Sequence, residues 1–363
     1  MGSMACHHLA QRGLKVLGLE QFDIPNTLGS SSGGSRMVRQ LYHEHPDYVA
    51  ILLRAYELWM DLERESGQKL MHIIGGLYMG EPGYDSIAGA IQTAEQNHLA
   101  HEVLDHAQIA QRFPQFQLPS HYVGLFEPTA GWVAPEKSVA AACHCAMIRG
   151  AELHGHEPVL KWTHRSDGVE VETPVATYHA DQIVFCGGAW MNELVHDLGI
   201  ELWVSRQVAG WVWPKRPEHF LPGRLPVWSL RRGDGTRLYG FPMNVEVPGL
   251  KVANHDRSVR AELRTLNREK LPGDESTFRS ALAALLPDAD GPLLSLQICM
   301  YTNSPDLNGI IGRHPRHPRV VVACGFSGHG FKLAPVVGSM LADFVVSDRT
   351  DLPCEFLSPV RFT

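Results

Sequence analysis

Long hydrophobic runs, excess positive charge and paired cysteines are all scarce in this 363-residue sequence. No apolar run approaches the roughly 18 residues that a membrane-spanning helix needs, so we expect no membrane segment. Lys and Arg number 32 against 39 Asp and Glu, a formal net charge of −7 without any basic run, so nucleic acid is not an expected partner. The seven cysteines do not suggest a disulfide framework, and no signal peptide is visible. We therefore expect a cytoplasmic protein.

What is present is typical of a globular protein with more than one domain. Hydrophobic residues make up 44% and charged residues 20% of the chain, and the length allows two or three domain-sized units. The run Cys-His-Cys at 143–145 falls in a predicted helix, where alternate residues point to different faces. We therefore expect no metal site there or elsewhere.

The first residues, MGSMACHHLAQRGLKVLGLEQFD, read like the second half of a dinucleotide-binding βαβ unit. They predict a helix that turns at Gly13 into an apolar strand over 14–19, with the acid Glu20 directly after it. In such a unit a strand and a G-x-G-x-x-G turn precede the helix, and an acid about 20 residues further on holds the ribose. Gly2 would be the third glycine, so we expect the first strand and two glycines to lie before residue 1.

Two further strand–loop–helix units follow in the middle and near the end of the chain. ADQIVFCGGAW is an apolar strand that ends in a glycine pair, and RVVVACGFSGHGFKLAPVVG is a strand followed by a glycine loop and a helix. Backbone N–H groups at such turns can face an anionic ligand, so three of them favour a nucleotide cofactor. Helices are also predicted over 46–67, 84–98, 107–113 and 136–149, and strands over 72–80, within 151–174 and within 201–256.

The three strand–loop–helix units are separated by long stretches with other patterns. This arrangement indicates one domain assembled from several chain segments, beside a second, sheet-rich domain. We predict an α/β fold in which residues 1–72, 132–200 and 305–363 form a Rossmann-like, cofactor-binding domain of discontinuous segments. A sheet-rich α+β substrate domain is predicted over residues 73–131 and 201–304.

Several separated stretches of the sequence carry a resemblance to one family. In chain order they include GSSSGGSRMVRQLYHE, FEPTAGW, CGGAW, YGFP, LKVANH, CMYTNSPD and GFSGHGFK. Together they resemble the monomeric sarcosine oxidase and N-methyltryptophan oxidase family, flavoproteins of the D-amino-acid-oxidase type. The resemblance implies an FAD-dependent oxidase of N-methyl amino acids that uses oxygen and yields an imine, then an aldehyde and an amino acid, with hydrogen peroxide. It also implies a monomer that acts away from membranes.

The resemblance implies that FAD is held by residues spread over the whole chain. Arg36 matches a residue near the flavin ring, and Cys299 matches the cysteine that forms a covalent bond to the flavin. The neighbours of Cys299 at 302–305 look like a polar turn, so the thiol is expected to be accessible. A buried, inert thiol is the alternative. The other FAD-binding residues that the resemblance implies are Gly2, Glu20, Ser30, Val159, Gly187, Trp190, Gly328, Gly330 and Lys332.

The resemblance also implies a substrate site. Arg39 and Lys332 match two residues that bind the substrate carboxylate, and charged donors suit a carboxylate in a partly dry pocket. Lys251 lies in an apolar run, which is unusual for an exposed lysine, and it matches the lysine that activates oxygen. Residues that line the substrate pocket are matched by Tyr239 and His255. The catalytic candidates are therefore Lys251, His255, Tyr239 and Arg36.

Two departures from the family pattern concern the arginine loop and the pocket. Ser31, Ser32 and Gly34 stand where close relatives carry a histidine pair and an acid, and Ser229 replaces a bulkier residue, which favours a substrate larger than sarcosine. The alternatives are an oxidase of cyclic or sugar-modified amino acids, such as pipecolate or fructosyl amino acids, and an inactive FAD-binding remnant. An NAD-dependent dehydrogenase is disfavoured because nothing in the sequence places a nicotinamide.

Overall fold

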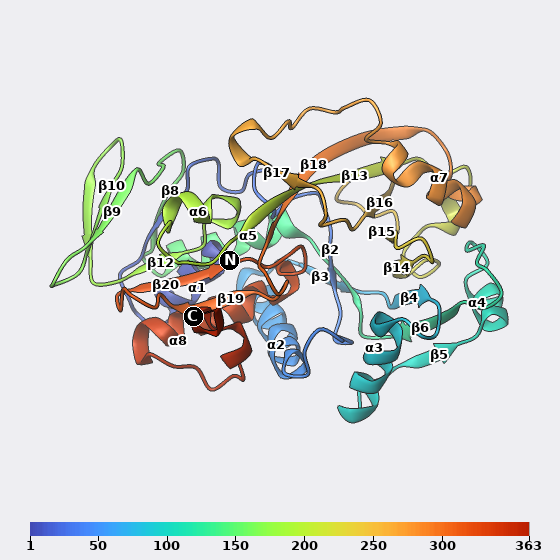
Figure 1. The fold of residues 1–363 in the computed structure, drawn as a ribbon, viewed down its shortest axis with the longest axis horizontal. Helices are drawn as coiled ribbons and strands as arrows, with labels where there is room; N and C mark the ends of the chain where they lie inside the picture. Colours follow the sequence, from blue (N-terminus) through green and yellow to red (C-terminus); the bar gives the residue numbers. More distant parts are fainter. Residues whose placement is uncertain (363) are drawn as a thin grey trace.

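The structure, a computed structural model of the chain, describes residues 1–362 and contains two regions built around different sheets (Figure 1). Short parallel strands covered by helices form one region, and a long, mainly antiparallel sheet forms the other. The mixed α/β class that the sequence predicts is confirmed. Among the described residues, none of the helices combines the length and the apolar character needed to cross a bilayer.

The parallel strands of the first region form two separate groups. β1 (Leu17–Leu19) pairs with β8 (Glu152–His154), while β12 (Ile183–Phe185) pairs with β20 (Val320–Cys324), which also pairs with β19 (Ile310–Arg313). Within residues 1–362, no strand pairs with the second edge of β1 or of β12. In the doubly wound strand order, the first strand lies between these two. The expectation of a strand before residue 1 agrees with this gap and stays a prediction.

Four helices pack against one another and against these strands: α1 (Gly2–Gln11), α2 (Tyr48–Ser66), α5 (Pro135–Ile148) and α8 (Ala334–Ser347). α1 and α8 come from opposite ends of the chain and approach closely because Gly338 has no side chain. A Cβ atom at Gly338 would lie 2.6 Å from the carbonyl carbon of Met4. The beginning and the end of the chain are therefore built into one layer.

Two small antiparallel sheets flank the first region. The sheet of β9, β10 and β11 stands at the edge of the molecule (Figure 1). The sheet of β2, β7 and β3 carries Arg36 in its first strand and leads toward the second region. These strands are β9 (Lys161–His164), β10 (Val169–Glu172), β11 (Thr177–Ala180), β2 (Arg36–Val38), β7 (Gly131–Val133) and β3 (Met71–Ile73).

The second region is a nine-stranded sheet in the order β17-β13-β16-β15-β14-β4-β6-β5, with β18 also paired to β13. Helix α7 (Ser276–Leu285) packs on β16, and α3 (Asp85–Gln96) and α4 (His106–Arg112) pack on the β4–β6 side. The strands are β17 (Arg260–Ala261), β13 (Trp203–Val212), β16 (Leu250–Asn254), β15 (Arg237–Phe241), β14 (Val227–Arg231), β4 (Gly76–Gly80), β6 (Val123–Glu127), β5 (Glu102–Leu104) and β18 (Leu293–Asn303).

Three local predictions differ from the structure. The strand predicted over 72–80 is two strands, because Gly75 has a φ of +83° and turns the chain from β3 into β4. The strand predicted over 14–19 is paired only over Leu17–Leu19, where β8 runs beside it. The polar turn predicted at 302–305 is wrong at its start, because residues 302 and 303 continue β18, paired with β13.

Candidate active site

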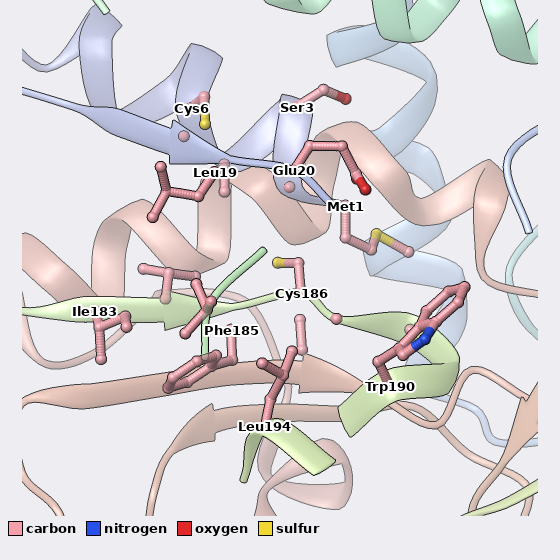
Figure 2. A pocket seen from close by; sticks show the side chains of 18 of the residues that line it. Met1, Ser3, Cys6, Leu19, Glu20, Ile183, Phe185, Cys186, Trp190 and Leu194 are labelled. Atoms are coloured by element: carbon pink, nitrogen blue, oxygen red, sulfur yellow. The ribbon is translucent and has the colours of Figure 1, made fainter. Parts of the chain in front are cut away.

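Two cavities meet where the two regions join. The larger has a volume of 2190 Å³ and lies between β1 and β12, with Glu20 on one side and Cys186 and Trp190 on the other (Figure 2). The smaller has a volume of 210 Å³. Arg36 and Cys299 line both cavities, as do Tyr301, Gly328 and Phe331, so the two spaces adjoin at these residues.

The predicted cofactor-binding residues line the larger cavity, except Lys332, which lines the smaller one. The carboxylate of Glu20, at the end of β1, accepts a hydrogen bond of 3.0 Å from the backbone N–H of Phe22, and its pKa is raised by burial. Gly328 has a φ of +84°, and a Cβ atom there would lie 2.6 Å from the ring of Tyr301. The larger cavity is lined by Gly2, Glu20, Ser30, Arg36, Val159, Gly187, Trp190, Cys299, Gly328 and Gly330.

Cys299 sits in the middle of β18, opposite Gln207 of β13, and not beside a turn as its neighbours suggest. Its thiol is partly exposed and lies 3.8 Å from the guanidinium of Arg36, where the two cavities adjoin. Burial instead raises the pKa of Cys6 and of Cys324 to about 12. Cys299 thus combines access to a cavity with a neighbouring positive charge.

Arg36 is held at this junction by the loop that precedes it. Its guanidinium donates to the carbonyl oxygens of Ser35, at 3.0 Å, and Ser30, at 3.1 Å. The hydroxyl of Ser30 in turn donates to the carbonyl of Met300 next to Cys299, at 2.8 Å. The guanidinium of Arg36 thus lies beside the thiol without a carboxylate partner among the described residues.

Lys251, on β16, is 2% exposed and faces the smaller cavity. Its ammonium donates to the carbonyl oxygens of Gly33, at 2.8 Å, and Ser35, at 2.9 Å, and lies 5.1 Å from the ring centre of Phe241. No carboxylate of residues 1–362 forms an ion pair with it. Burial, followed by the charge of Arg36, holds the pKa of Lys251 well below its ordinary value.

Arg39 and Glu44 form a half-buried ion pair, with 3.2 Å between Nη2 and Oε1. Burial opposes the charge of both groups. For Arg39, Glu44 outweighs burial and raises the pKa; for Glu44, Arg39 and His43 outweigh burial and lower the pKa to about 2. The guanidinium also lies 4.5 Å from the ring centre of Tyr42.

Lys332 occupies the same end of the cavity and is held by a short hydrogen-bonded chain. Its ammonium donates to the carbonyl of His329, at 2.8 Å, and to the hydroxyl of Tyr42, at 3.2 Å. That hydroxyl donates to Nδ1 of His329, at 2.6 Å, while Nε2 of His329 donates to the carbonyl of Leu307. This arrangement requires a neutral imidazole, and burial accordingly lowers the pKa of His329 to about 3. Burial, followed by the charge of Arg39, lowers the pKa of Lys332 to about 7.

His255 and Tyr239 also line the smaller cavity. Nδ1 of His255 lies 3.1 Å from the hydroxyl of Tyr301, and burial, followed by the charge of Arg257, holds the pKa of His255 well below its ordinary value. The pKa of Tyr239 is raised by burial. The site therefore places neutral groups beside its buried cations.

The structure also brings residues to the smaller cavity that the sequence reasoning does not name. They come from the LYHE end of the arginine loop, from β14 and β15, from the segment after β16, from β18 and from the last glycine loop. The residues of the arginine loop, of β18 and of the glycine loop belong to the motifs quoted above, whereas the arginines lie outside them. The lining residues are Glu44, Arg231, Arg237, Arg257, Tyr301 and His329, and Tyr42 is joined to them through its hydrogen bond with Lys332.

The geometry agrees with comparisons to known proteins. Residues 1–344 match the family model described as FAD dependent oxidoreductase, and the chain belongs to this family. It is 42% identical to the monomeric sarcosine oxidase of Streptomyces avermitilis, over 99% of this chain and 95% of that protein. It is 30% identical to an N-methyl-L-tryptophan oxidase of Salmonella heidelberg, over 100% of this chain and 96% of that protein.

Solved structures share the fold over almost the whole chain. The open form of NikD, described as an unusual amino acid oxidase essential for nikkomycin biosynthesis, has a TM-score of 0.86. Its sequence is 25% identical to this one, with 98% of this chain and 94% of that chain covered. The family match makes FAD the cofactor of this chain.

The residues of the larger cavity fit an FAD. Glu20 ends the strand that follows α1, where an acid suits the ribose hydroxyls of a dinucleotide. The first backbone N–H groups of α1 and the glycine turns at 187–188 and 328–330 border the same space, which suits a pyrophosphate. The thiol of Cys299 and the charge of Arg36 stand at the end that adjoins the smaller cavity.

Proposed function

We propose that this protein oxidises N-methylated, secondary amino acids, and that FAD is attached covalently through Cys299. The observation that carries the proposal is the junction of the two cavities at Arg36 and Cys299. The cofactor-sized space ends there, and a small space with two cations, Arg39 and Lys332, begins. The curated relatives named for sarcosine and N-methyl-L-tryptophan support this substrate class.

We propose that Arg39 and Lys332 bind the substrate carboxylate. Arg39 is already oriented by Glu44 and stacked on Tyr42, and Lys332 by Tyr42 and the carbonyl of His329. Side chains held in place by other contacts lose little entropy on binding, so such donors bind an anion well. A carboxylate bound between them fixes one end of the amino acid.

The same cations act on the substrate's amine. An ammonium group is disfavoured beside Arg39 and Lys332 and next to a neutral His255, so the amine binds in its unprotonated form. An unprotonated amine is the form whose neighbouring C–H bond can be broken by loss of a hydride equivalent. Bound FAD would supply the redox chemistry, as acceptor of that hydride equivalent and donor of electrons to oxygen.

Lys251 is proposed to assist the oxygen step. Reduction of oxygen develops negative charge, and a fixed cation in a water-poor site stabilises that charge more strongly than water does. Burial of Lys251 favours the neutral amine, whereas its hydrogen bonds to two carbonyl oxygens and the negative charge that develops on oxygen favour the ammonium form. Tyr239 and His255 are proposed to complete the wall that faces the substrate.

We also propose that the chain divides as the sequence predicts. Residues 1–72, 132–200 and 305–363 would form the FAD-binding domain, and residues 73–131 and 201–304 the substrate domain. The two sheet systems support this division, because β1, β8, β12, β19 and β20 belong to the first set and all strands of the nine-stranded sheet to the second. The name of the Streptomyces relative supports a monomer, which light scattering can test.

Peroxide release tests the proposed activity. Flavin-loaded protein is assayed with sarcosine, N-methylalanine, N-methyltryptophan, pipecolate and a fructosyl amino acid. The volume of the smaller cavity, 210 Å³, lies below the roughly 300–1,000 Å³ of pockets for drug-sized ligands, so compact N-methyl amino acids should be oxidised best. Peroxide from pipecolate or the fructosyl substrate alone would contradict the proposal. Bound flavin without turnover of any substrate would favour the inactive remnant.

A further inference from the structure

Three arginines line the smaller cavity without an acidic partner: Arg231 at the end of β14, Arg237 at the start of β15, and Arg257 shortly after β16. None of them takes part in an ion pair with any described residue, although Arg231 stacks on the ring of Tyr84. Their neighbour Arg232 differs, because it faces Asp234, with 3.4 Å between Nη1 and Oδ2.

The arginines that approach the cavity interior are poorly solvated. The Nε atom of Arg257 is buried and has no hydrogen-bond partner within residues 1–362. Burial lowers the pKa of Arg257 and of Arg237, and Arg231 and Arg257 lower the pKa of Arg237 further by repulsion. A buried donor without a partner is costly, so its retention at a cavity wall points to a ligand that supplies the partner.

The charges around the cavity do not balance with a single carboxylate. Glu44 is the only acid among the described residues that line it, and Glu44 is already paired with Arg39. The carboxylate of a simple amino acid such as sarcosine would balance Lys332. Arg237 and Arg257 would remain without a counter-charge, as would Arg231, Arg36 and Lys251, which line the same cavity.

We propose that the preferred substrate is a secondary amino acid with a second acidic group, which Arg237 and Arg257 bind. This inference rests on the proposed function and narrows its substrate class. Arg231, which stacks on Tyr84 near the rim, adds positive potential that attracts such an anion. Ser229, on β14, lines the same wall and leaves room beyond the size of sarcosine. The acid can lie on the amino-acid side chain or on the nitrogen substituent.

A comparison of substrates tests the proposal and distinguishes a second acid on the side chain from one on the nitrogen substituent. Flavin-loaded enzyme is assayed with sarcosine, with N-methyl-L-aspartate and N-methyl-L-glutamate, and with iminodiacetate, which carries its second acid on the nitrogen substituent. We expect one of the two kinds of diacid to exceed sarcosine in kcat/KM by about tenfold or more, as one charged hydrogen bond allows. If sarcosine is oxidised at least as efficiently as every diacid, the proposal is wrong while the proposed function stands.

Substitutions test whether Arg237 and Arg257 cause the preference for the diacid. Arg257→Gln and Arg237→Gln should each lower kcat/KM for the diacid by about tenfold, mainly through KM, and lower it much less for sarcosine. Arg232→Gln, one residue beyond β14 and already paired with Asp234, is the matched control and should behave as the wild type. Equal losses for sarcosine and the diacid in the Arg257 variant would overturn the assignment.

A binding measurement keeps the proposal testable if no substrate is turned over or a variant fails to fold. Thiodiacetate and (methylthio)acetate differ by one carboxylate and lack the oxidisable amine. Thiodiacetate carries its second acid at the position of the nitrogen substituent, and (methylthio)succinate with 2-(methylthio)propanoate forms the matching pair for an acid on the side chain. Calorimetry on the wild-type protein should give a dissociation constant about tenfold lower for the dicarboxylate in one of these two pairs. Equal constants within both pairs would overturn the proposal, whether or not the proposed oxidase activity is found.

Discussion

The ammonium nitrogen of Lys251 lies 2.8 Å from the carbonyl oxygen of Gly33, 218 residues earlier in the chain. Gly33 has a φ of +96°, and a Cβ atom there would lie 3.4 Å from that nitrogen. The glycine loop and β16 therefore hold one buried charge between them.

Lys251→Met should slow the reaction of the reduced enzyme with oxygen by roughly 10²–10³-fold, because a preorganised charge contact is lost. Anaerobic reduction by substrate should slow much less. Stopped-flow absorbance measures the two half-reactions separately. Lys137→Met, which removes a surface lysine paired with Glu246, is the control and should leave both unchanged. Equal slowing of both half-reactions would mean that Lys251 serves substrate binding or the local fold.

Cys299→Ser should release the flavin. After acid precipitation, we expect flavin in the pellet of the wild-type protein and in the supernatant of the variant, because a thioether survives denaturation. Cys186→Ser is a matched control, since Cys186 also lines the larger cavity. Flavin that stays with the pellet of the Cys299 variant would refute the covalent assignment.

The carboxylate contact of Arg39 must be tested without leaving Glu44 unpaired. We therefore compare Arg39→Gln/Glu44→Gln with Glu44→Gln alone. The double variant should raise KM for amino-acid substrates by about 10- to 150-fold, since one hydrogen bond to a charged group contributes about 1.5–3 kcal/mol. An N-methylamine that lacks the carboxylate should be affected little. A similar loss for that amine would instead assign Arg39 to the flavin or to the fold.

Affinity for an anion should depend on pH through Lys332, whose pKa is lowered to about 7. The carboxylate of (methylthio)acetate stays ionised above pH 5, and it binds the protonated amine of Lys332 better than the neutral form. Binding should therefore be strongest below pH 7 and weaken, by up to about tenfold per pH unit, as the pH rises through 7. The affinity stops falling at the pH where Lys332 is neutral and Arg39 alone binds the anion. Calorimetry across pH 5.5–9 measures this, and Lys332→Gln should give a flat profile.

The unpaired edges of β1 and β12 lead to a prediction about the larger cavity. An apolar strand followed by G-x-G-x, added before Met1, should pair with both edges and bring glycine N–H groups to the pyrophosphate. We expect higher flavin occupancy and a higher melting temperature than for the chain of 363 residues. The same extension with proline in the strand is the control, because proline cannot complete the ladder. An unchanged melting temperature and occupancy would exclude this pairing.

Most of the fold can be predicted from the sequence because the residue patterns that specify its helices and turns are local. The stop at Gly67, which has a φ of +67°, and the glycine pair after β12 follow from residue preferences. β18 was missed because its long pairing with β13 depends on partners about 90 residues away, and Cys299 appears next to polar residues. Strand pairing between residues so far apart in the chain cannot be recognised from the local residue pattern.

The sequence predicts only part of the candidate site, for a related reason. Arg39 and Lys332 follow from motifs, whereas Arg237 and Arg257 lie just outside the motifs YGFP and LKVANH, where an arginine looks like solvated surface. Their position at a cavity wall depends on how β15 and β16 lie in the nine-stranded sheet. Whether an arginine is paired with an acid is likewise a property of three-dimensional packing.

The hydrogen bond between Lys332 and Tyr42 joins residues 290 positions apart, and this has a consequence during protein synthesis. At about 5–20 residues per second, a ribosome needs roughly 15–60 s to make the intervening chain. β12 is made during that time and lacks its partner β20 until residues 320–324 are made, and the carboxylate end of the pocket lacks one of its two cations until Lys332 is made. A nascent chain released in this interval has no site to bind the amino acid, and its open strand edges make it a client for chaperones.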